Sequence, residues 1–231
     1  MSIPKHFCWS KFGVEAGEAI QSIIARKEVE RTGNGGVFLW GIGNALGSSI
    51  AALLHNARMP EVLFTPIRSA PRAVDVSPAA VVAWTSAETI DGSSYDLPPA
   101  SFVTSRAPSR AGKSHYALVC RAERTLTIEE SEDRFFGSQM KNLKSGNLVG
   151  FSQVTSVVCR DEKLPAAGAQ YMVAMRAQLV FPYFIRLCDP VEVPVAADVS
   201  DPRFQKAIRG QDATHHRTQR HKSRQLALNV H

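Results

Sequence analysis

The chain has 231 residues, of which 44% are hydrophobic and 21% are charged, a composition typical of folded domains. It excludes a wholly disordered chain, a collagen-like repeat and a small disulfide scaffold, since the sequence has no internal repeat and four cysteines. The formal net charge of +6 is uneven, because the last 31 residues carry seven Lys and Arg against two acidic residues, whereas residues 1–200 carry 20 against 19. The sequence therefore predicts one nearly neutral domain, 1–200, followed by a basic, disordered tail, 201–231.

The sequence lacks long apolar runs and metal-ligand motifs, which bears on localisation and on metal binding. The first residues hold no apolar run typical of a signal peptide, and no later run approaches the roughly 20 apolar residues that span a bilayer. The four cysteines (Cys8, Cys120, Cys159, Cys188) form no C-x-x-C pair and have no histidine pair at ligand spacing. We expect a cytoplasmic protein with reduced thiols, no metal site and no membrane partner.

The first third of the chain contains the clearest local patterns. Apolar residues at near-helical spacing predict an amphipathic helix at 14–28, and glycines and an asparagine predict a turn at 32–36. Residues 37–40, which are β-branched, aromatic or aliphatic and are flanked by glycines, predict a strand. Residues 48–54 predict a short helix with a serine cap.

After residue 60 the sequence changes to short β-like runs separated by prolines and small polar residues. A further short helix is predicted only at 135–143. Many short strands without regular βαβ alternation favour an α+β domain built on a partly closed antiparallel or mixed β-barrel with flanking helices. The strands predicted in this part are 62–68, 74–76, 81–84, 101–104, 116–121, 148–151, 154–160, 171–181 and 185–188.

Two segments partly match nucleotide-binding loops. Residues 107–114 end in Gly-Lys-Ser like a phosphate-binding loop, but a predicted strand follows where such a loop needs a helix. Residues 41–47 join a strand to a short helix, but the glycine spacing is one residue longer than in a dinucleotide-binding turn. Neither match is sufficient to predict a cofactor, and we expect none.

The three tryptophans suggest a binding pocket. Trp9, Trp40 and Trp84 each lie in or beside a predicted strand, next to small or polar residues, where an indole can stack on a planar ligand. An ordinary place in the core is the commoner fate of such residues. Asn44, in the turn after the strand at 37–40, and Arg68, as a phosphate contact, complete this set of candidates.

Three segments resemble known nucleic-acid-binding domains. Phe7-Cys-Trp-Ser-Lys11, followed by a helix, resembles the opening of EVE and YTH domains. Residues 25–40 are similar to the ASCH pattern of a helix that leads into a barrel strand, with Ala25 and Thr32 in place of the usual glycine and arginine. Residues 144–151 are similar to a turn and strand common to PUA-like barrels, with Asn147 in place of aspartate.

The resemblance implies a PUA-like module that binds RNA or DNA and reads a modified or flipped base through an aromatic pocket. In that interpretation the ligand-binding residues are Trp9, Ser10, Lys11, Trp40, Asn44, Trp84 and Arg68. Basic residues of the tail would contact the nucleic-acid backbone, namely Arg217, Arg220, Lys222 and Arg224.

Two other functions remain open at this point. The first is an enzyme acting on nucleotides or nucleic-acid bases, for which Lys27 and Glu30 are weak catalytic candidates because their i, i+3 spacing places them on one helix face. The second is a structural or interaction protein, for example a component of a mobile-element or defence system.

Overall fold

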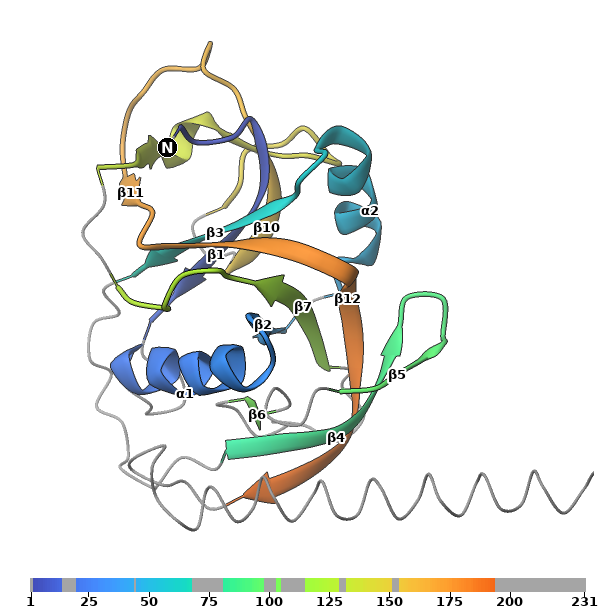
Figure 1. Ribbon diagram of the computed structural model, residues 1–231. Coiled ribbons are helices and arrows are strands. Elements are labelled where there is room, and N and C mark those ends of the chain that lie inside the picture. Colours follow the sequence, from blue (N-terminus) through green and yellow to red (C-terminus); the bar gives the residue numbers. More distant parts are fainter. Residues whose placement is uncertain are drawn as a thin grey trace, which may run out of the picture.

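The computed structural model describes residues 2–13, 20–43, 45–67, 81–97, 103–104, 115–128, 132–150 and 154–193. Within these residues the fold is α+β, with one large mixed sheet, a two-stranded ribbon and two α-helices (Figure 1). Asn44, Arg68 and the tail at 201–231 lie outside the described residues. The predictions made for them therefore remain predictions.

The large sheet has ten strands: β1 (His6–Phe12), β2 (Val37–Ile42), β3 (Glu61–Pro66), β4 (Val81–Thr89), β5 (Ser94–Tyr95), β6 (Val103–Thr104), β7 (His115–Arg121), β9 (Met140–Asn142), β10 (Thr155–Arg160) and β12 (Met175–Val193). Its main path runs β2-β7-β12-β3-β1-β10-β9, and β4 pairs with β12 away from this path and also with β5 and β6. β1 and β3 are parallel, and the other pairs are antiparallel.

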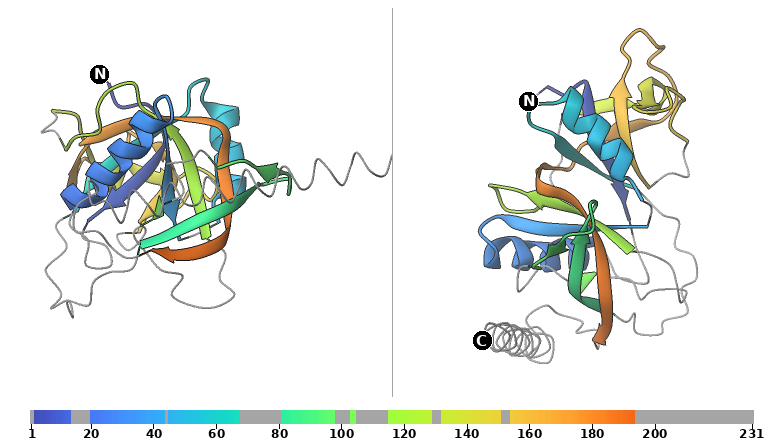
Figure 2. Two further views of the ribbon diagram at one scale, coloured as in Figure 1. Left: turned by 60° about the horizontal axis from the view of Figure 1, so that its bottom comes forward. Right: turned by 90° about the vertical axis from the view of Figure 1, so that its right-hand side faces the viewer.

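Strand β12 connects the parts of the sheet. It is 19 residues long and pairs with β3 through residues 175–178, with β7 on both sides of a register shift between Leu179 and Phe184, and with β4 from residue 185 onward. Figure 2 shows that β12 (orange) bends as it passes from its first partners to β4. One strand therefore holds β3, β7 and β4 in a single sheet.

Each helix packs against a different part of the sheet. Helix α1 (Ile20–Gly33) contacts β2 and buries Ile23 and Ile24, and α2 (Gly47–Asn56) contacts β1 and buries Ile50 and Leu53. In α2 the two buried residues are three apart, as expected of a helix that covers a sheet, whereas α1 also buries the charged side chains of Arg26, Lys27 and Glu30. The helices predicted at 14–28 and 48–54 correspond to α1 and α2, although residues 14–19 lie outside the described residues and α1 extends to Gly33. The serine cap is wrong, because Leu46 caps α2 without a side-chain hydrogen bond.

The turn between α1 and β2 has a backbone conformation that favours glycine at residues 35 and 36. Gly35 and Gly36 have φ values of 59° and 92°, a region that side chains with a Cβ rarely adopt. A Cβ on Gly36 would also lie 3.2 Å from the carbonyl oxygen of Ala122. The turn thus brings the chain closely past β7 and directly into β2.

The helix predicted at 135–143 is wrong. This segment forms β8 (Arg134–Phe136), the 3-10 helix η1 (Gly137–Gln139) and then β9. β8 pairs with β11 (Gln170–Met172) in the two-stranded ribbon, and β9 pairs with β10. Pairing with strands that come later in the chain overrides the local helical pattern.

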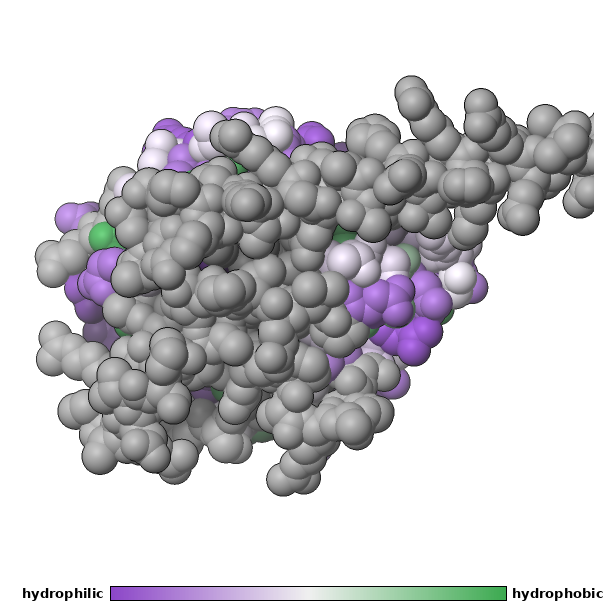
Figure 3. All heavy atoms as spheres, turned by 90° about the horizontal axis from the view of Figure 1, so that it is seen from below, coloured by the Kyte–Doolittle hydropathy of each residue, from purple (hydrophilic) through white to green (hydrophobic). Residues whose placement is uncertain are grey.

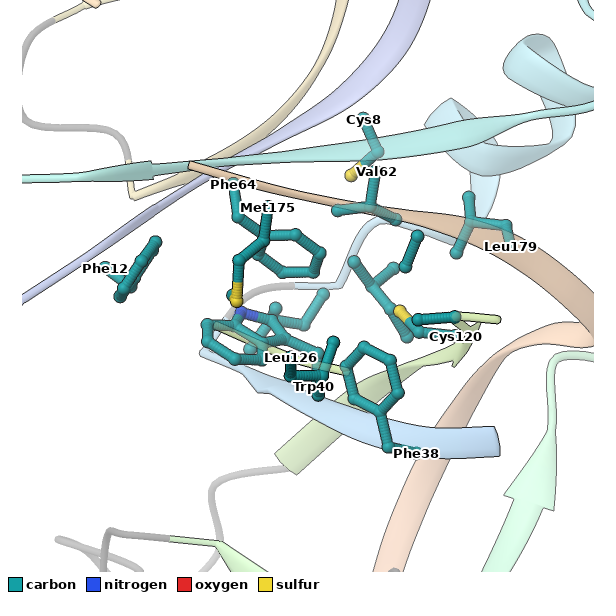
Figure 4. Packing of buried hydrophobic residues seen from close by; sticks show 14 of the residues in the cluster. Cys8, Phe12, Phe38, Trp40, Val62, Phe64, Cys120, Leu126, Met175 and Leu179 are labelled. Atoms are coloured by element: carbon teal, nitrogen blue, oxygen red, sulfur yellow. The ribbon is translucent and has the colours of Figure 1, made fainter. Parts of the chain in front are cut away.

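The interior consists of two hydrophobic clusters on opposite faces of β1. Because side chains alternate along a strand, Cys8 and Phe12 belong to the larger cluster, and Phe7 and Trp9 belong to the smaller one. Figure 4 shows the larger cluster, in which Trp40 lies beside Phe64 and Met175. The smaller cluster is completed by residues such as Phe135 of β8.

The α+β class is thus confirmed, whereas the barrel is not. β2 and β9 are the two ends of the main strand path and do not pair with each other in the described part of the chain.

On the face seen in Figure 3, the coloured atoms are mostly hydrophilic or of intermediate hydropathy. Among the described helices, none is long and apolar enough to cross a membrane.

Candidate functional site

Eight polar or charged side chains are buried among the described residues, and they gather at two places. We call the first the strand-end cluster: Ser10, Lys11, Thr65, Thr155 and Ser156. We call the second the α1 charge cluster: Arg26, Lys27 and Glu30. Since a buried polar group is costly unless it is compensated, each cluster requires a structural or functional explanation.

The strand-end cluster arises from the pairing of three neighbouring strands. Lys11 of β1 lies opposite Thr65 in the parallel pair with β3, and Ser10 lies opposite Thr155 in the antiparallel pair with β10. The carboxyl ends of β1 and β3 therefore meet the beginning of β10. In sheets with parallel strands, such strand ends are frequent places for ligand binding.

On one face of β1, the cluster contains a charge beside aromatic rings. The Nε1 atom of Trp9 donates a hydrogen bond to Thr65 Oγ1 at 3.1 Å. The Nζ atom of Lys11 lies 4.8 Å from the centroid of the Trp9 ring and 5.9 Å from that of Tyr171 on β11. Burial lowers the pKa of Lys11 from its ordinary value, while the ring faces partly stabilise the ammonium.

On the other face, Ser10 links two elements. The Nε1 atom of Trp40 donates to Ser10 Oγ at 3.0 Å, and Ser10 Oγ shares a hydrogen bond with Thr155 Oγ1 at 3.1 Å. The Trp40 ring contacts Phe12 and Phe64 edge to face, as Figure 4 illustrates. Ser10 thereby fixes the orientation of the Trp40 indole.

The structure does not bring the three predicted tryptophans into one pocket. Trp9 and Trp40 lie in different hydrophobic clusters, and Trp84 on β4 packs against His115. All three are buried, and the indole N–H groups of Trp9 and Trp40 already donate to hydroxyls within the protein. Trp9, Ser10, Lys11 and Trp40 are nevertheless associated with the same strand ends, whereas Trp84 is not.

The α1 charge cluster joins helix α1 to strand β2. Lys27 Nζ and Glu30 Oε1 form an ion pair at 2.7 Å, and Glu30 Oε2 accepts a hydrogen bond from the backbone N–H of Leu39 at 3.2 Å. Among the described strands β2 pairs only with β7 and is therefore an edge strand. The Glu30 carboxylate accepts a hydrogen bond from one backbone N–H group on this edge.

Glu30 is also the described carboxyl group whose ionisation is most clearly changed by the fold. Burial raises the pKa of Glu30 to about 7, although the positive charges of Lys27 and Arg26 and the Leu39 hydrogen bond act in the opposite direction. These contacts give Lys27 and Glu30 a structural role, and through Leu39 they steady the strand that also carries Trp40.

The sequence did not single out Thr65, Thr155, Ser156 or Tyr171. The first three are hydroxyl residues next to apolar runs, Thr65 after residues 62–64 and Thr155 and Ser156 before residues 157–158, and this is the signal that points to them. Their association with Ser10 and Lys11 depends on β pairing between distant parts of the chain. The hydrogen bond from Trp9 to Thr65 joins residues 56 positions apart, and the hydrogen bond between Ser10 and Thr155 joins residues 145 positions apart.

The cysteines show no ligand geometry in the described part of the chain. All four are free thiols, and burial raises the pKa of Cys8 to about 12. No group of three or more His, Cys, Asp or Glu residues that could hold a metal ion occurs among the described residues.

Comparisons with family models, with curated proteins and with solved structures found no match to this chain.

Proposed function

We propose that the protein is a nucleic-acid-binding module that receives a modified or flipped base at the strand-end cluster. The observation that carries this proposal is that the adjoining ends of β1, β3 and β10 bury five polar side chains, with Lys11 on the face of β1 that carries Trp9 and Ser10 on the opposite face. Hydrophobic side chains make up the two clusters that lie on either side of β1. A group of hydroxyls and one ammonium in such an interior suits the recognition of a small polar ligand.

The chemistry of the cluster is suited to a nucleobase. Proteins read an unstacked base with aromatic surfaces on its faces and hydrogen bonds along its edge. Trp9 and Tyr171 supply aromatic surface, and the partly exposed Tyr171 lies toward the outside of this group. Lys11 and Thr65 supply hydrogen-bond donors on the same face.

The same proposal includes membership of the PUA-like superfamily and a partly closed barrel. It is supported by a β1 strand that carries Trp9, Ser10 and Lys11, by helix α1 that comes next among the described elements, and by the strand β2 that follows it. Tail residues such as Arg217 and Arg224 would add affinity for phosphates without base preference.

The test is binding of short single- and double-stranded RNA and DNA, with and without modified bases, measured by fluorescence anisotropy at low salt. Ser10→Ala removes the hydroxyl that holds Trp40. We expect it to weaken binding by roughly fivefold, because losing a buried hydrogen bond costs about 1 kcal/mol and loosens the strand ends that hold the base. Ser86→Ala, which removes a partly exposed hydroxyl on β4 that donates to Asp189, is the matched control and should bind like the wild type.

Thermal unfolding of both variants checks that the fold is retained. If the intact protein binds none of these nucleic acids, the proposal is wrong. Equal losses for Ser10→Ala and Ser86→Ala would show that the strand-end cluster is not the binding site.

A further inference from the structure

One face of the strand-end cluster is covered by the rest of the protein. Trp9, Lys11 and Thr65 are 2%, 4% and 1% exposed. A base that reaches these side chains must therefore displace an element that covers them. Strand pairing identifies this element, because a strand within a sheet is held by backbone hydrogen bonds to its neighbours.

The ribbon of β8 and β11 is the covering element that backbone pairing holds least. Its two strands form a separate sheet and pair with each other through three register pairs, and a two-stranded ribbon has little stability of its own. β1, β3 and β10 each have a strand partner on both sides in the large sheet. In Figure 1, β11 (orange) accordingly lies apart from the strands of the main path.

Aromatic contacts hold the ribbon on the Trp9 face of β1. The rings of Tyr171 and Phe135 meet the Trp9 ring edge to face, at centroid distances of 4.7 and 5.2 Å. Phe135 also contacts Phe7 at 5.7 Å. Because Lys11 Nζ lies 5.9 Å from the centroid of the Tyr171 ring, displacement of the ribbon uncovers Trp9 and Lys11 together.

An ion pair ties the ribbon to the large sheet. Arg176 of β12 donates through Nη2 to Oδ2 of Asp133, the residue before β8, at 2.7 Å. Arg176 also pairs with Glu61 of β3 at 3.2 Å, and this second contact keeps the guanidinium on the sheet when Asp133 moves away. The ribbon can therefore separate and return to the same partner.

We propose that the ribbon of β8 and β11 is a lid that opens to admit a nucleobase to the Trp9 face of the strand-end cluster and then closes over it. This inference rests on the proposed function, because the nucleic acid supplies the base. The open lid leaves Trp9 to stack on the base and Lys11 and Thr65 to donate to its edge. Entry is from this face, because the larger hydrophobic cluster fills the other face of β1.

Lysine labelling in the absence of nucleic acid tests the lid by itself. Lys11 and Lys27 are buried to a similar degree, but Lys11 lies against the ribbon and Lys27 lies in α1 beside Glu30. The intact protein is treated with an amine-acetylating reagent, and mass spectrometry follows each lysine. Asp133→Asn weakens the ion pair with Arg176, so Lys11 should react roughly threefold faster than in the wild type, while the Lys27 rate is unchanged.

Glu88→Gln is the matched control, because it weakens an ion pair with Arg186 between β4 and β12, away from the ribbon. It should leave both labelling rates unchanged. An unchanged Lys11 rate in Asp133→Asn, or equal acceleration of Lys11 and Lys27, overturns the lid.

The wild-type protein decides the matter if Asp133→Asn does not fold. Opening of the ribbon exposes little surface, so the Lys11 rate should stay nearly constant at low urea concentrations. The Lys27 rate should rise with urea, because that amine becomes accessible on global unfolding. The same urea dependence for both lysines overturns the lid.

A final labelling experiment connects the lid to binding. The oligonucleotide that binds most tightly in the anisotropy experiment is added at a saturating concentration, and it should protect Lys11 from acetylation without changing the Lys27 rate. Binding without protection of Lys11 overturns the inference and leaves the proposed function intact. If no oligonucleotide binds, the proposed function is wrong, and with it the role of the ribbon in admitting a base.

Discussion

At the scale of single residues, Glu30 shows how a buried carboxylate is accommodated. Lys27 neutralises it and the Leu39 amide donates to it, so both oxygens have partners. The other titratable groups that face this site are Arg26 on the same helix and Cys120 on β7. Burial still outweighs these contacts and leaves the pKa of Glu30 at about 7.

This raised pKa predicts a particular dependence of stability on pH. Between pH 4.5, the ordinary pKa of the group, and pH 7, the folded protein binds a proton at Glu30 that the unfolded chain has released. The free energy of unfolding should therefore fall as pH rises through this window, by about 3 kcal/mol. The double variant Lys27→Met/Glu30→Gln removes the titrating group while retaining an oxygen for Leu39.

Urea denaturation at a series of pH values measures this effect. The double variant should lack the decrease, whereas a matched change of the partly exposed pair, Lys141→Met/Asp161→Asn, should retain it. Identical profiles for the wild type and the Lys27→Met/Glu30→Gln variant would contradict the assignment of the decrease to Glu30.

At the scale of elements, the alternation along β1 separates the site into two faces. Ser10 contacts Trp40 on one face, and Lys11 contacts the Trp9 ring on the other. The ribbon of β8 and β11 covers the second face through Phe135 and Tyr171. Access to Lys11 thus depends on how closely this ribbon packs on the sheet.

The ribbon contact makes Gly137 a sensitive position. A Cβ at this residue would lie 2.9 Å from Cε2 of Tyr171, so Gly137→Ala should displace the tyrosine ring from Trp9. We expect destabilisation of about 1–3 kcal/mol, typical of overpacking. Hydrogen exchange should accelerate in β11 but not in β4. Gly92→Ala is unsuitable as a control, because the backbone at Gly92 has a φ of 84°, which an alanine rarely adopts.

Gly43→Ala provides the control, because a Cβ added to that glycine would meet nothing within 4 Å and its φ is not positive. Unchanged exchange in β11 of Gly137→Ala would mean that Tyr171 moves without loosening the ribbon.

The sequence predicted those elements whose determinants are local. β2 combines β-branched and aromatic residues with a flanking glycine turn, and α2 has an apolar stripe, so both were identified within a few residues. β8 and β9 were missed, because their conformation depends on partners later in the chain. Ser10 and Lys11 were predicted as site residues from the local motif at 7–11. Thr65 and Thr155 were not predicted, because they join the cluster only through strand pairing.

At the scale of the whole molecule, the charge is divided between two regions. Seven of the 27 Lys and Arg residues lie in 201–231, against two of the 21 acidic residues. Residues 1–200 are close to neutral, so under the proposed function selectivity comes from a site and not from a general basic surface.

Removal of residues 201–231 should therefore weaken binding to all nucleic acids and leave the preference between bases unchanged. The dependence of affinity on salt should also become shallower, because fewer phosphates are neutralised and fewer counterions released. Titrations of the full chain and the truncated chain at several salt concentrations measure both effects. A loss of base preference on truncation would show that the tail itself takes part in recognition.

The position of β12 in the sheet has a consequence for biosynthesis. It is the last described strand in the chain, yet it lies between β7 and β3 and also pairs with β4. While a ribosome is still translating residues 175–193, the strands made earlier have no central partner and their edges are unprotected. The sheet is thus completed only after residue 193 has been made, and a nascent chain that stops before this strand lacks the connection between its two halves.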